Sequence, residues 1–299
     1  FWEHRNLLGA AEKLRVSAQA GTFSQRMVAD FRKPDFRRPG QDLLAKTSAI
    51  RTNSDAFDEL TLAGFAGLER QLSQRWRVSG GGSVDLSQVT DQLSIETVQL
   101  FGVPLKATRD NRDDLLDPTR GSVLGFELTP FAGSGSETLA FALGRVSAAG
   151  YLALDGRHRV VLAGRARLAA LAGEKTAAIP ANKRLYAGGG GSVRGYEFQK
   201  IGPLDVEHDP VGGRSLFEIG AEARLRVTDA FGIVPFVEGG NVWDAILPEQ
   251  PGRLRWAAGL GLRYYTDIGP ARVDVAVPLN KRKNIDDDFQ LYFSLGQAF

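Results

Sequence analysis

Apolar and polar side chains alternate with a period of two along several stretches of the chain. Over residues 217–227 apolar side chains alternate with glutamate, glycine and arginine, and the alternation recurs over residues 255–264, 272–279 and 289–299. Because successive residues of a β-strand point to opposite faces, this period is typical of strands and not of helices. Each segment is therefore predicted to be a strand with one apolar face and one charged or glycine-rich face.

The predicted strands are longer than those of an ordinary soluble β-sandwich. Strands of soluble proteins have about 5–6 residues, whereas a strand needs about 9–11 residues to cross a bilayer at a tilt. An apolar outer face and a polar inner face are typical of outer-membrane barrels, which close because lipid tolerates no unpaired backbone edge. We therefore predict an all-β fold, a transmembrane antiparallel β-barrel.

Turn residues between the alternating segments divide the chain into about fifteen strands. The predicted strands cover residues 1–6, 13–20, 23–32, 43–52, 59–71, 75–87, 92–108, 121–131, 138–154, 158–172, 215–227, 232–242, 253–266, 270–279 and 288–299. Single-chain bacterial barrels have an even number of strands. We therefore expect about sixteen strands, the first strand or so lying before residue 1.

Composition limits the remaining possibilities. The chain has 299 residues, a net charge of +2, no cysteine and 43% hydrophobic residues. It holds no apolar run long enough for a transmembrane helix, its charges are interleaved and give no reason to expect nucleic acid, and the lack of cysteine is weakly in favour of an envelope compartment. Residues 1–299 are interpreted as one barrel domain. Because they begin without methionine, we interpret them as a mature or excised C-terminal portion.

One predicted connection, residues 173–214, is far longer than the others, and loops of such length are usually functional or disordered. It contains four consecutive glycines, which permit positive φ and a close approach to another surface. We therefore expect this loop to dock on the wall. The residues of interest are Gly188, Gly189, Gly190 and Gly191, followed by Val193, Arg194, Gly195 and Tyr196.

The tetrapeptide Val193–Tyr196 in the sixth outer loop resembles the VRGF/Y motif of the BamA/TamA superfamily of outer-membrane assembly and translocation barrels. The resemblance spans nearly the whole chain and is strongest to the TamA branch, the translocation and assembly module. The segments that carry it are residues 5–9, 117–121, 184–196, 235–243, 262–270 and 296–299.

The resemblance implies that the loop folds back into the barrel lumen, where acids of the inner wall hold Arg194. The implied partners are Glu222 and Glu238, the latter at a position where the family usually has aspartate. Independently, the alternation places Glu222 on the polar face, and Glu238 opposite the apolar Val237. Truncating such a buried pair is costly, so the motif is interpreted as a latch. The alternative is a salt bridge with a purely structural role.

The resemblance also implies a seam where the first and last strands meet, at which a client strand adds by backbone pairing. The residues assigned to the terminal strand of this seam are Phe293, Leu295, Gly296 and Phe299. An aromatic-ended tail of this kind is also what barrel-assembly machinery reads. The alternative interpretation of this tail is simply that the protein is itself a client, and both interpretations can hold together.

The function implied is insertion, assembly or translocation of outer-membrane β-barrel proteins such as autotransporters, in the bacterial outer membrane. The expected partners are outer-membrane lipid and lipopolysaccharide, client outer-membrane proteins and a TamB-like periplasm-spanning protein, with POTRA domains before the barrel. A BamA-type general assembly barrel and a two-partner-secretion transporter are alternatives within the superfamily. A passive porin is a more remote one.

Catalytic functions find little support in the sequence. The glycine run lacks the lysine of a P-loop and the last glycine of a dinucleotide-binding loop, and no G-x-S-x-G elbow occurs. The three histidines, His4, His158 and His208, are scattered along the chain. We therefore expect no enzyme activity, no cofactor and no metal, with a serine hydrolase as a remote alternative.

Overall fold

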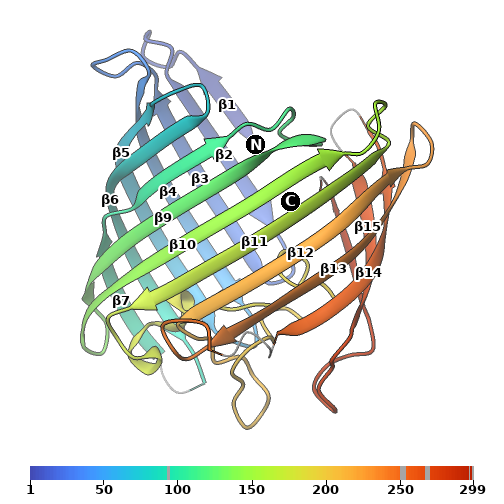
Figure 1. The fold of residues 1–299 in the computed structure, drawn as a ribbon. Coiled ribbons are helices and arrows are strands. Elements are labelled where there is room, and N and C mark those ends of the chain that lie inside the picture. The colour runs from blue at the N-terminus through green and yellow to red at the C-terminus, as the bar shows by residue number, and fades with distance from the viewer. Residues whose placement is uncertain (93–94, 250–253, 267–269, 296, 298–299) are drawn as a thin grey trace. The chain divides into compact units, whose positions relative to one another are not determined.

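The computed structural model describes residues 1–92, 95–249, 254–266, 270–295 and 297. They form sixteen β-strands and two short 3-10 helices, and none of their helices is long and apolar enough to cross a membrane (Figure 1). The elements are β1 (Trp2–Arg5), β2 (Lys13–Ala20), β3 (Ser24–Lys33), β4 (Gln41–Asn53), β5 (Asp58–Gln71), β6 (Trp76–Thr90), β7 (Ile95–Gly102), β8 (Leu105–Asp110), β9 (Arg120–Ser134), β10 (Thr138–Ala153), β11 (Val160–Ala172), η1 (Thr176–Ala178), η2 (Ala181–Lys183), β12 (Ser215–Arg226), β13 (Phe231–Trp243), β14 (Arg255–Tyr264), β15 (Ala271–Pro278) and β16 (Gln290–Leu295).

The strands form a single sheet in which sequence neighbours lie side by side, from β1 at one end of the order to β16 at the other. The described strand pairs are antiparallel; for example, Glu222 of β12 lies opposite Phe236 of β13, and Asp274 of β15 lies opposite Gly261 of β14. This arrangement confirms the predicted all-β antiparallel fold of about sixteen strands. Strand ends differ from the predicted ranges by a few residues.

One predicted strand, residues 92–108, is wrong as a single element. The structure has two strands there, β7 and β8, which pair with different parts of β6. The break falls at Val103 and Pro104, and proline has no N–H to donate to a ladder. Its carbonyl instead accepts from the N–H of Gly81 at 3.2 Å, and the N–H of Val103 donates to the carbonyl of Pro130 at 3.1 Å. Because β8 lies off the main path, fifteen positions remain in the strand order.

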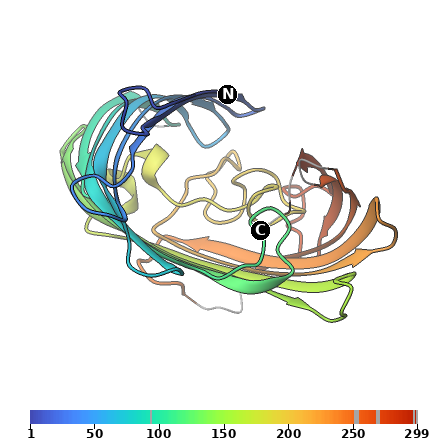
Figure 2. The ribbon, with the colours of Figure 1, turned by 90° about the horizontal axis from the view of Figure 1, so that it is seen from above.

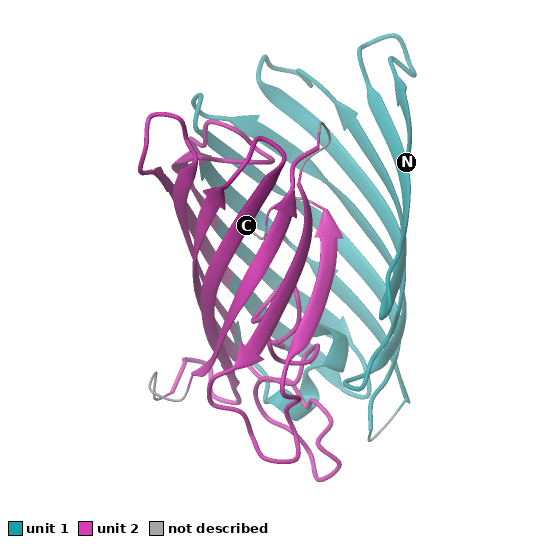
Figure 3. Ribbon diagram, turned by 90° about the vertical axis from the view of Figure 1, so that its right-hand side faces the viewer, with its two compact units in different colours: residues 1–109, 126–144, 171–184 teal, residues 110–125, 145–170, 185–299 magenta. Residues whose placement is uncertain are grey.

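The chain divides into two compact units (Figure 3). Unit 1 comprises residues 1–109, 126–144 and 171–184, and therefore holds β1–β7, most of β8 and both 3-10 helices. Unit 2 comprises residues 110–125, 145–170 and 185–299, and holds β12–β16 with most of the long loop. Strands β9, β10 and β11 contribute residues to both units.

Burial in unit 2 reverses the pattern of a soluble protein. On β12 the charged Glu218, Glu222 and Arg224 are buried, whereas Ile219 between them is 39% exposed. The same inversion holds on β13, where Glu238 is buried and the adjacent Val237 is exposed. Such a sheet suits a lipid environment. Its apolar side chains can contact lipid on one face, while its charged side chains find partners on the other face.

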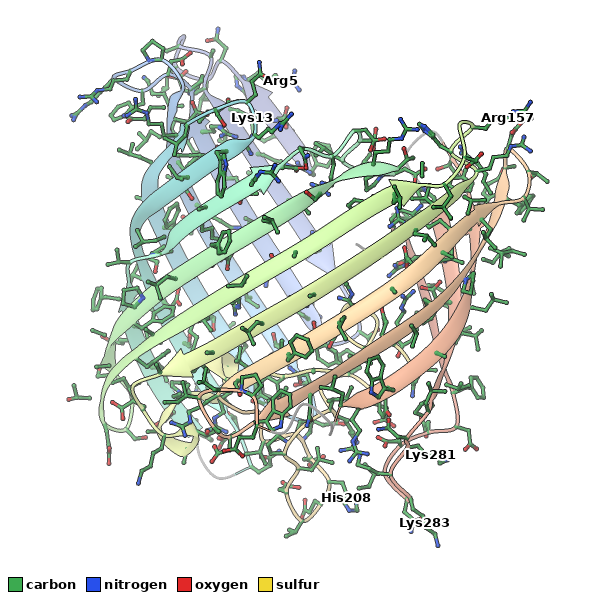
Figure 4. All side chains as sticks on the ribbon, in the orientation of Figure 1. Arg5, Lys13, Arg157, His208, Lys281 and Lys283 are labelled. Atoms are coloured by element: carbon green, nitrogen blue, oxygen red, sulfur yellow. The ribbon has the colours of Figure 1, made fainter. Side chains whose placement is uncertain are left out.

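The connections of unit 2 gather at the two ends of its strands. Arg157, in the β10–β11 turn, lies at one end, and His208, Lys281 and Lys283 lie at the opposite end (Figure 4). The unit 2 part of the long loop, residues 185–214, and the β15–β16 connection therefore share one end of the strands. Two seam residues of the sequence prediction, Gly296 and Phe299, lie outside the described residues.

Candidate functional site

The part of the long loop in unit 2 lies on the charged face of β12–β16 (Figure 2). Isolated bridges close it on itself, between Leu185 and Gly213 and between Ala187 and Ile201. At the centre of this fold the N–H of Gly189 donates to the carbonyl of Tyr196 at 3.1 Å. The VRGY motif is thereby presented as a narrow turn with its side chains directed into the wall.

Gly195 allows this turn to approach the wall. Its φ is +98°, a region that side-chain-bearing residues rarely adopt. A Cβ atom added there would lie 2.8 Å from the Cβ of Ala257 on β14 and 3.2 Å from the carbonyl carbon of Val277 on β15. A Cβ atom added at Gly191, in contrast, would meet no atom within 4 Å. Close packing therefore does not require a glycine at every position of the loop.

Arg194 is buried and makes its main contacts with Glu238 of β13. Its backbone N–H and its Nη2 each donate to a different Glu238 carboxylate oxygen at 2.8 Å, and Nε donates at 3.1 Å. Both partners are 1% exposed. Two side-chain bonds and one backbone bond to a single carboxylate fix the position and the orientation of the guanidinium.

Two further acids complete the surroundings of this guanidinium. Asp274 of β15 accepts from Nη1 of Arg194 at 2.8 Å. Glu222 of β12 lies farther away, its Oε2 3.6 Å from Nη2, which is an ion pair without a hydrogen bond. Arg194 therefore links three strands of one sheet through a single planar cation.

The aromatic ring of Phe236 covers the guanidinium of Arg194, with Cζ 3.4 Å from the ring centroid. Such a contact favours a cation over the ring face. Burial opposes the charge of Arg194, but the hydrogen bond to Glu238 and the charges of Glu238, Asp274 and Glu222 outweigh it and raise the pKa of Arg194 above its usual value. Arg194 is therefore a permanent cation.

Two tyrosines hold the turn on either side of the motif. The hydroxyl of Tyr196 lies 2.9 Å from Oδ1 of Asn280 and 3.1 Å from the carbonyl oxygen of Trp256, and either oxygen can accept its one proton. The hydroxyl of Tyr292 on β16 accepts from the N–H of Gly195 at 3.1 Å and donates to the carbonyl of Tyr196 at 3.0 Å. The terminal strand thus contacts the motif directly.

The serine that precedes the motif extends the contact to the end of β12. Ser192 donates to Glu218, which also accepts from Arg167 of β11 at 3.0 Å. Arg165, on the same strand, donates to the carbonyl of Ser192 and, at 3.1 Å, to Glu238. Wall arginines therefore support the acids that bind the motif.

A second branch of charges leads from the motif toward the opposite end of unit 2. Glu222 accepts from Nε of Arg224 at 2.7 Å, and Arg224 donates to the carbonyl of Pro118 at 3.2 Å. In the turn at residues 110–120, Asp117 in turn accepts from Gln297 at 2.8 Å. Buried polar groups thus connect the motif to that turn.

The structure brings together the predicted motif residues and both predicted acids, and it adds residues that sequence reasoning missed. Val193, Arg194, Gly195 and Tyr196 are all buried against the wall. Asp274, Phe236 and Tyr292 were not singled out, although each stands on the polar side of its strand's alternation. Asp274 is the sole acid of β15, and that signal could have identified it.

The described seam residues, Phe293 and Leu295, point away from the charged face and are 70% and 69% exposed. The loop glycines Gly188 and Gly189 have positive φ, whereas Gly190 packs against Tyr292. Within the described part of the chain no three histidine, cysteine or acidic side chains gather as a metal site. The chemistry offered by this site is tight, oriented ion pairing between loop and wall.

Comparison with known proteins gives a consistent picture. The Omp85 superfamily domain matches residues 6–299. The outer membrane protein assembly factor BamA of Nitratidesulfovibrio vulgaris is 28% identical over 204 residues, which cover 65% of this chain and 25% of that protein. The chain therefore spans about a quarter of that relative's length.

Two solved structures are similar in fold. BamA from Haemophilus ducreyi lacking POTRA domains 1–3 matches with a TM-score of 0.80 and 20% identity, covering 97% of this chain and 65% of that chain. CdiB from Acinetobacter baumannii matches with a TM-score of 0.65 and 17% identity, covering 98% of this chain and 55% of that chain. These likenesses show the fold, an antiparallel β-barrel of the BamA type.

Proposed function

Because the chain belongs to the Omp85 superfamily, we propose that it assembles or secretes outer-membrane proteins, with residues 185–214 acting as a latch on the wall of the barrel. The protein is located in the outer membrane, as are the proteins of this superfamily that it resembles. The observation that carries the proposal is the buried Arg194, which three strands hold through Glu238, Asp274 and Glu222.

The latch suits a wall that must hold its loop firmly and still release it. An arginine buried with carboxylates keeps its charge and binds in one orientation. Breaking one such pair leaves an uncompensated charge and costs about 3–5 kcal/mol. The loop is therefore seated until another interaction of comparable size, such as the addition of a client strand, replaces it.

The terminal strands supply the proposed entry point for that client strand. In the described strand order β1 and β16 are terminal, with β2 and β15 as their neighbours. A strand edge freed at such a terminal position is a template for β-augmentation. Tyr292 of β16 also forms hydrogen bonds with the motif. Binding of the loop to the wall and the position of β16 therefore stabilise each other.

Within this function we propose the TamA-type role, translocation and assembly of clients such as autotransporters with a TamB-like partner. The support is the set of TamA-like segments around the motif and along β13. The BamA relatives favour a general assembly barrel as the alternative, and a two-partner-secretion transporter is the second alternative. Affinity purification of the full-length protein from outer membranes separates them: a TamB-like partner supports the first, and Bam lipoproteins support the second.

The test of the latch is Arg194→Ala in the full-length protein. We expect the variant to insert into the outer membrane but to assemble few client barrels, because the loop then lacks its main anchor. Insertion is measured by the heat-dependent mobility of the folded barrel on gels, and client assembly by the amount of folded client in outer-membrane fractions.

The matched control is Lys175→Ala, which removes an exposed cation from the same loop. It is expected to assemble clients like the unmodified protein. Normal client assembly by Arg194→Ala, at equal abundance in the membrane, would show that the ion pairs are structural only and would overturn the latch.

A further inference from the structure

The first part of the long loop, residues 173–184, belongs to unit 1 and contains no residue of the VRGY motif. It is nevertheless firmly placed. η1 and η2 lie beside the sheet strands of unit 1 (Figure 2), and Thr176, Ile179 and Ala181 are buried. A loop segment that only led to the motif would have little reason to bury these side chains.

Three consecutive side chains of this segment each donate to a different acid at β5 or β6. The pairs are Asn182 with Glu59 at 2.9 Å, Lys183 with Asp85 at 2.5 Å and Arg184 with Asp91 at 3.4 Å. Asn182 also reaches the hydroxyl of Ser87 at 3.4 Å. Each of the three loop donors thus has its own acidic acceptor on the wall.

One of the wall acceptors, Glu59, is held in place by the strands themselves. Glu59 accepts from the hydroxyls of Thr52 at 2.8 Å and Thr61 at 2.9 Å. Thr61 lies opposite Ser87 in the β5–β6 register, and a hydrogen bond of 2.9 Å joins their two hydroxyl oxygens. Because these bonds do not involve the loop, the wall positions Glu59 for Asn182 independently of the loop.

Burial makes these contacts stronger than surface ion pairs. The side chains of Lys183 and Asp85 are 18% and 14% exposed, and those of Arg184 and Asp91 are 8% and 11% exposed. Exposed pairs contribute little to stability, whereas pairs largely removed from water are costly to break. Lys183 also lies 5.5 Å from the ring centroid of Phe131, a distance that allows a cation–π contact.

We propose that Asn182, Lys183 and Arg184 form a second anchor of the long loop, a positioning site that holds residues 173–184 on β5 and β6 independently of Arg194. The inference goes beyond the proposed latch, since it rests on contacts within unit 1 alone. Its consequence is that release of Arg194 frees residues 185–214 while the start of the loop stays seated. Residues 185–214 can then leave the wall and bind it again while residues 173–184 keep them close to their site.

Site-specific thiol labelling of the full-length protein in outer membranes tests this proposal, because the chain has no cysteine of its own. Thr176→Cys reports on the second anchor and Val193→Cys on the latch, both at buried positions. Lys183→Ala is expected to raise the labelling rate at position 176 roughly tenfold. The reason is that the loss of one charge-assisted hydrogen bond makes local opening of the segment easier by about that factor. The rate at position 193 should stay unchanged.

The reverse pattern is expected for Arg194→Ala, with faster labelling at position 193 and unchanged labelling at position 176. Lys283→Ala, which removes an exposed cation from the β15–β16 connection, is the control and should change neither rate. The exchanged pair Lys183→Asp with Asp85→Lys should restore protection at position 176. Asp85→Asn provides a second way to weaken the anchor if Lys183→Ala accumulates poorly.

Unchanged labelling at position 176 in both Lys183→Ala and Asp85→Asn would overturn the second anchor. If either substitution raised the labelling rates at positions 176 and 193 equally, the loop would open as one unit. That result would overturn the independence of the second anchor from Arg194. Client assembly by Arg194→Ala is scored separately. Failure of the proposed function is therefore distinguishable from failure of the second anchor.

Discussion

Asp274 is shared by more cations than any other acid around the motif. Its carboxylate accepts from Arg194 at 2.8 Å and from Arg263 of β14, and Nε of Arg272 lies 3.7 Å away. Both Asp274 and Arg263 are fully buried. Three guanidinium groups around one carboxylate leave a local surplus of positive charge, so the loss of this acid is poorly compensated.

We therefore expect Asp274→Asn to be strongly destabilising although it preserves the shape of the side chain. The predicted loss in free energy of unfolding is about 3–5 kcal/mol, the range for removing one partner of a buried ion pair. Denaturant unfolding of the barrel in detergent micelles measures it. Asp288→Asn removes an exposed partner of Lys281 and should change the free energy of unfolding by no more than about 1 kcal/mol.

Tyr196 gives the latch a dependence on alkaline pH. Burial, followed by the charge of Asp286, raises the pKa of Tyr196 to about 12. A raised pKa means that folding favours the neutral hydroxyl, which donates to Asn280 or Trp256. Its contribution to stability is therefore complete below the ordinary tyrosine pKa of about 10 and is lost as the pH rises through 12.

The expected result is that the stability of the unmodified protein falls more steeply between pH 10 and 12 than that of Tyr196→Phe. Denaturant midpoints of the two proteins, measured in parallel across this range, give the difference. The comparison cancels the titration of the other tyrosines and the lysines. Identical pH profiles would contradict a role for the hydroxyl of Tyr196.

At the scale of the element, β16 has two faces with different tasks. Tyr292 points to the loop and bonds Gly195 and Tyr196, whereas Phe293 points away from it and is 70% exposed. Adjacent residues of one strand thus serve the latch and the lipid-facing surface. Substitutions at neighbouring positions should therefore have separable effects.

Tyr292→Phe is expected to loosen the latch by about 1 kcal/mol for each hydrogen bond lost, while the barrel still inserts. Phe293→Lys should instead impair insertion, at a cost of about 2–4 kcal/mol near the bilayer centre and less near its surfaces. Labelling at Val193→Cys measures the first effect, and the folded fraction in lipid vesicles measures the second. Equal defects in both assays for both variants would contradict the division of faces.

At the scale of the whole molecule, the seated loop distinguishes an assembly barrel from a passive porin. Barrels of about 16–18 strands enclose an aqueous channel unless something occupies it. If residues 185–214 occupy the lumen, the unmodified protein should show a small current in planar bilayers. Arg194→Ala should show a larger and more variable current because its loop is no longer anchored. A large, steady current from the unmodified protein would favour the porin.

Much of this fold could be predicted because lipid imposes a simple pattern. Residues 13–20 were predicted as a strand and form β2 with the same bounds, and alternation placed Glu222 and Glu238 on the charged face of their strands. The prediction for residues 92–108 was wrong because period-two alternation continues through Pro104, although proline interrupts the ladder. Alternation shows which face of the sheet a side chain lies on, but it does not show which strand its residue pairs with.

The sequence by itself determined the fold class, the polar and apolar faces of the strands and the loop that carries Arg194, because each follows from local chemistry and spacing. Only the tertiary structure decided which polar residues meet. Strand register brings Asp274 and Tyr292, 80 and 98 residues beyond Arg194, to the same turn as Glu238. Register and the docked position of a loop depend on contacts between distant segments, and no spacing within one segment records them.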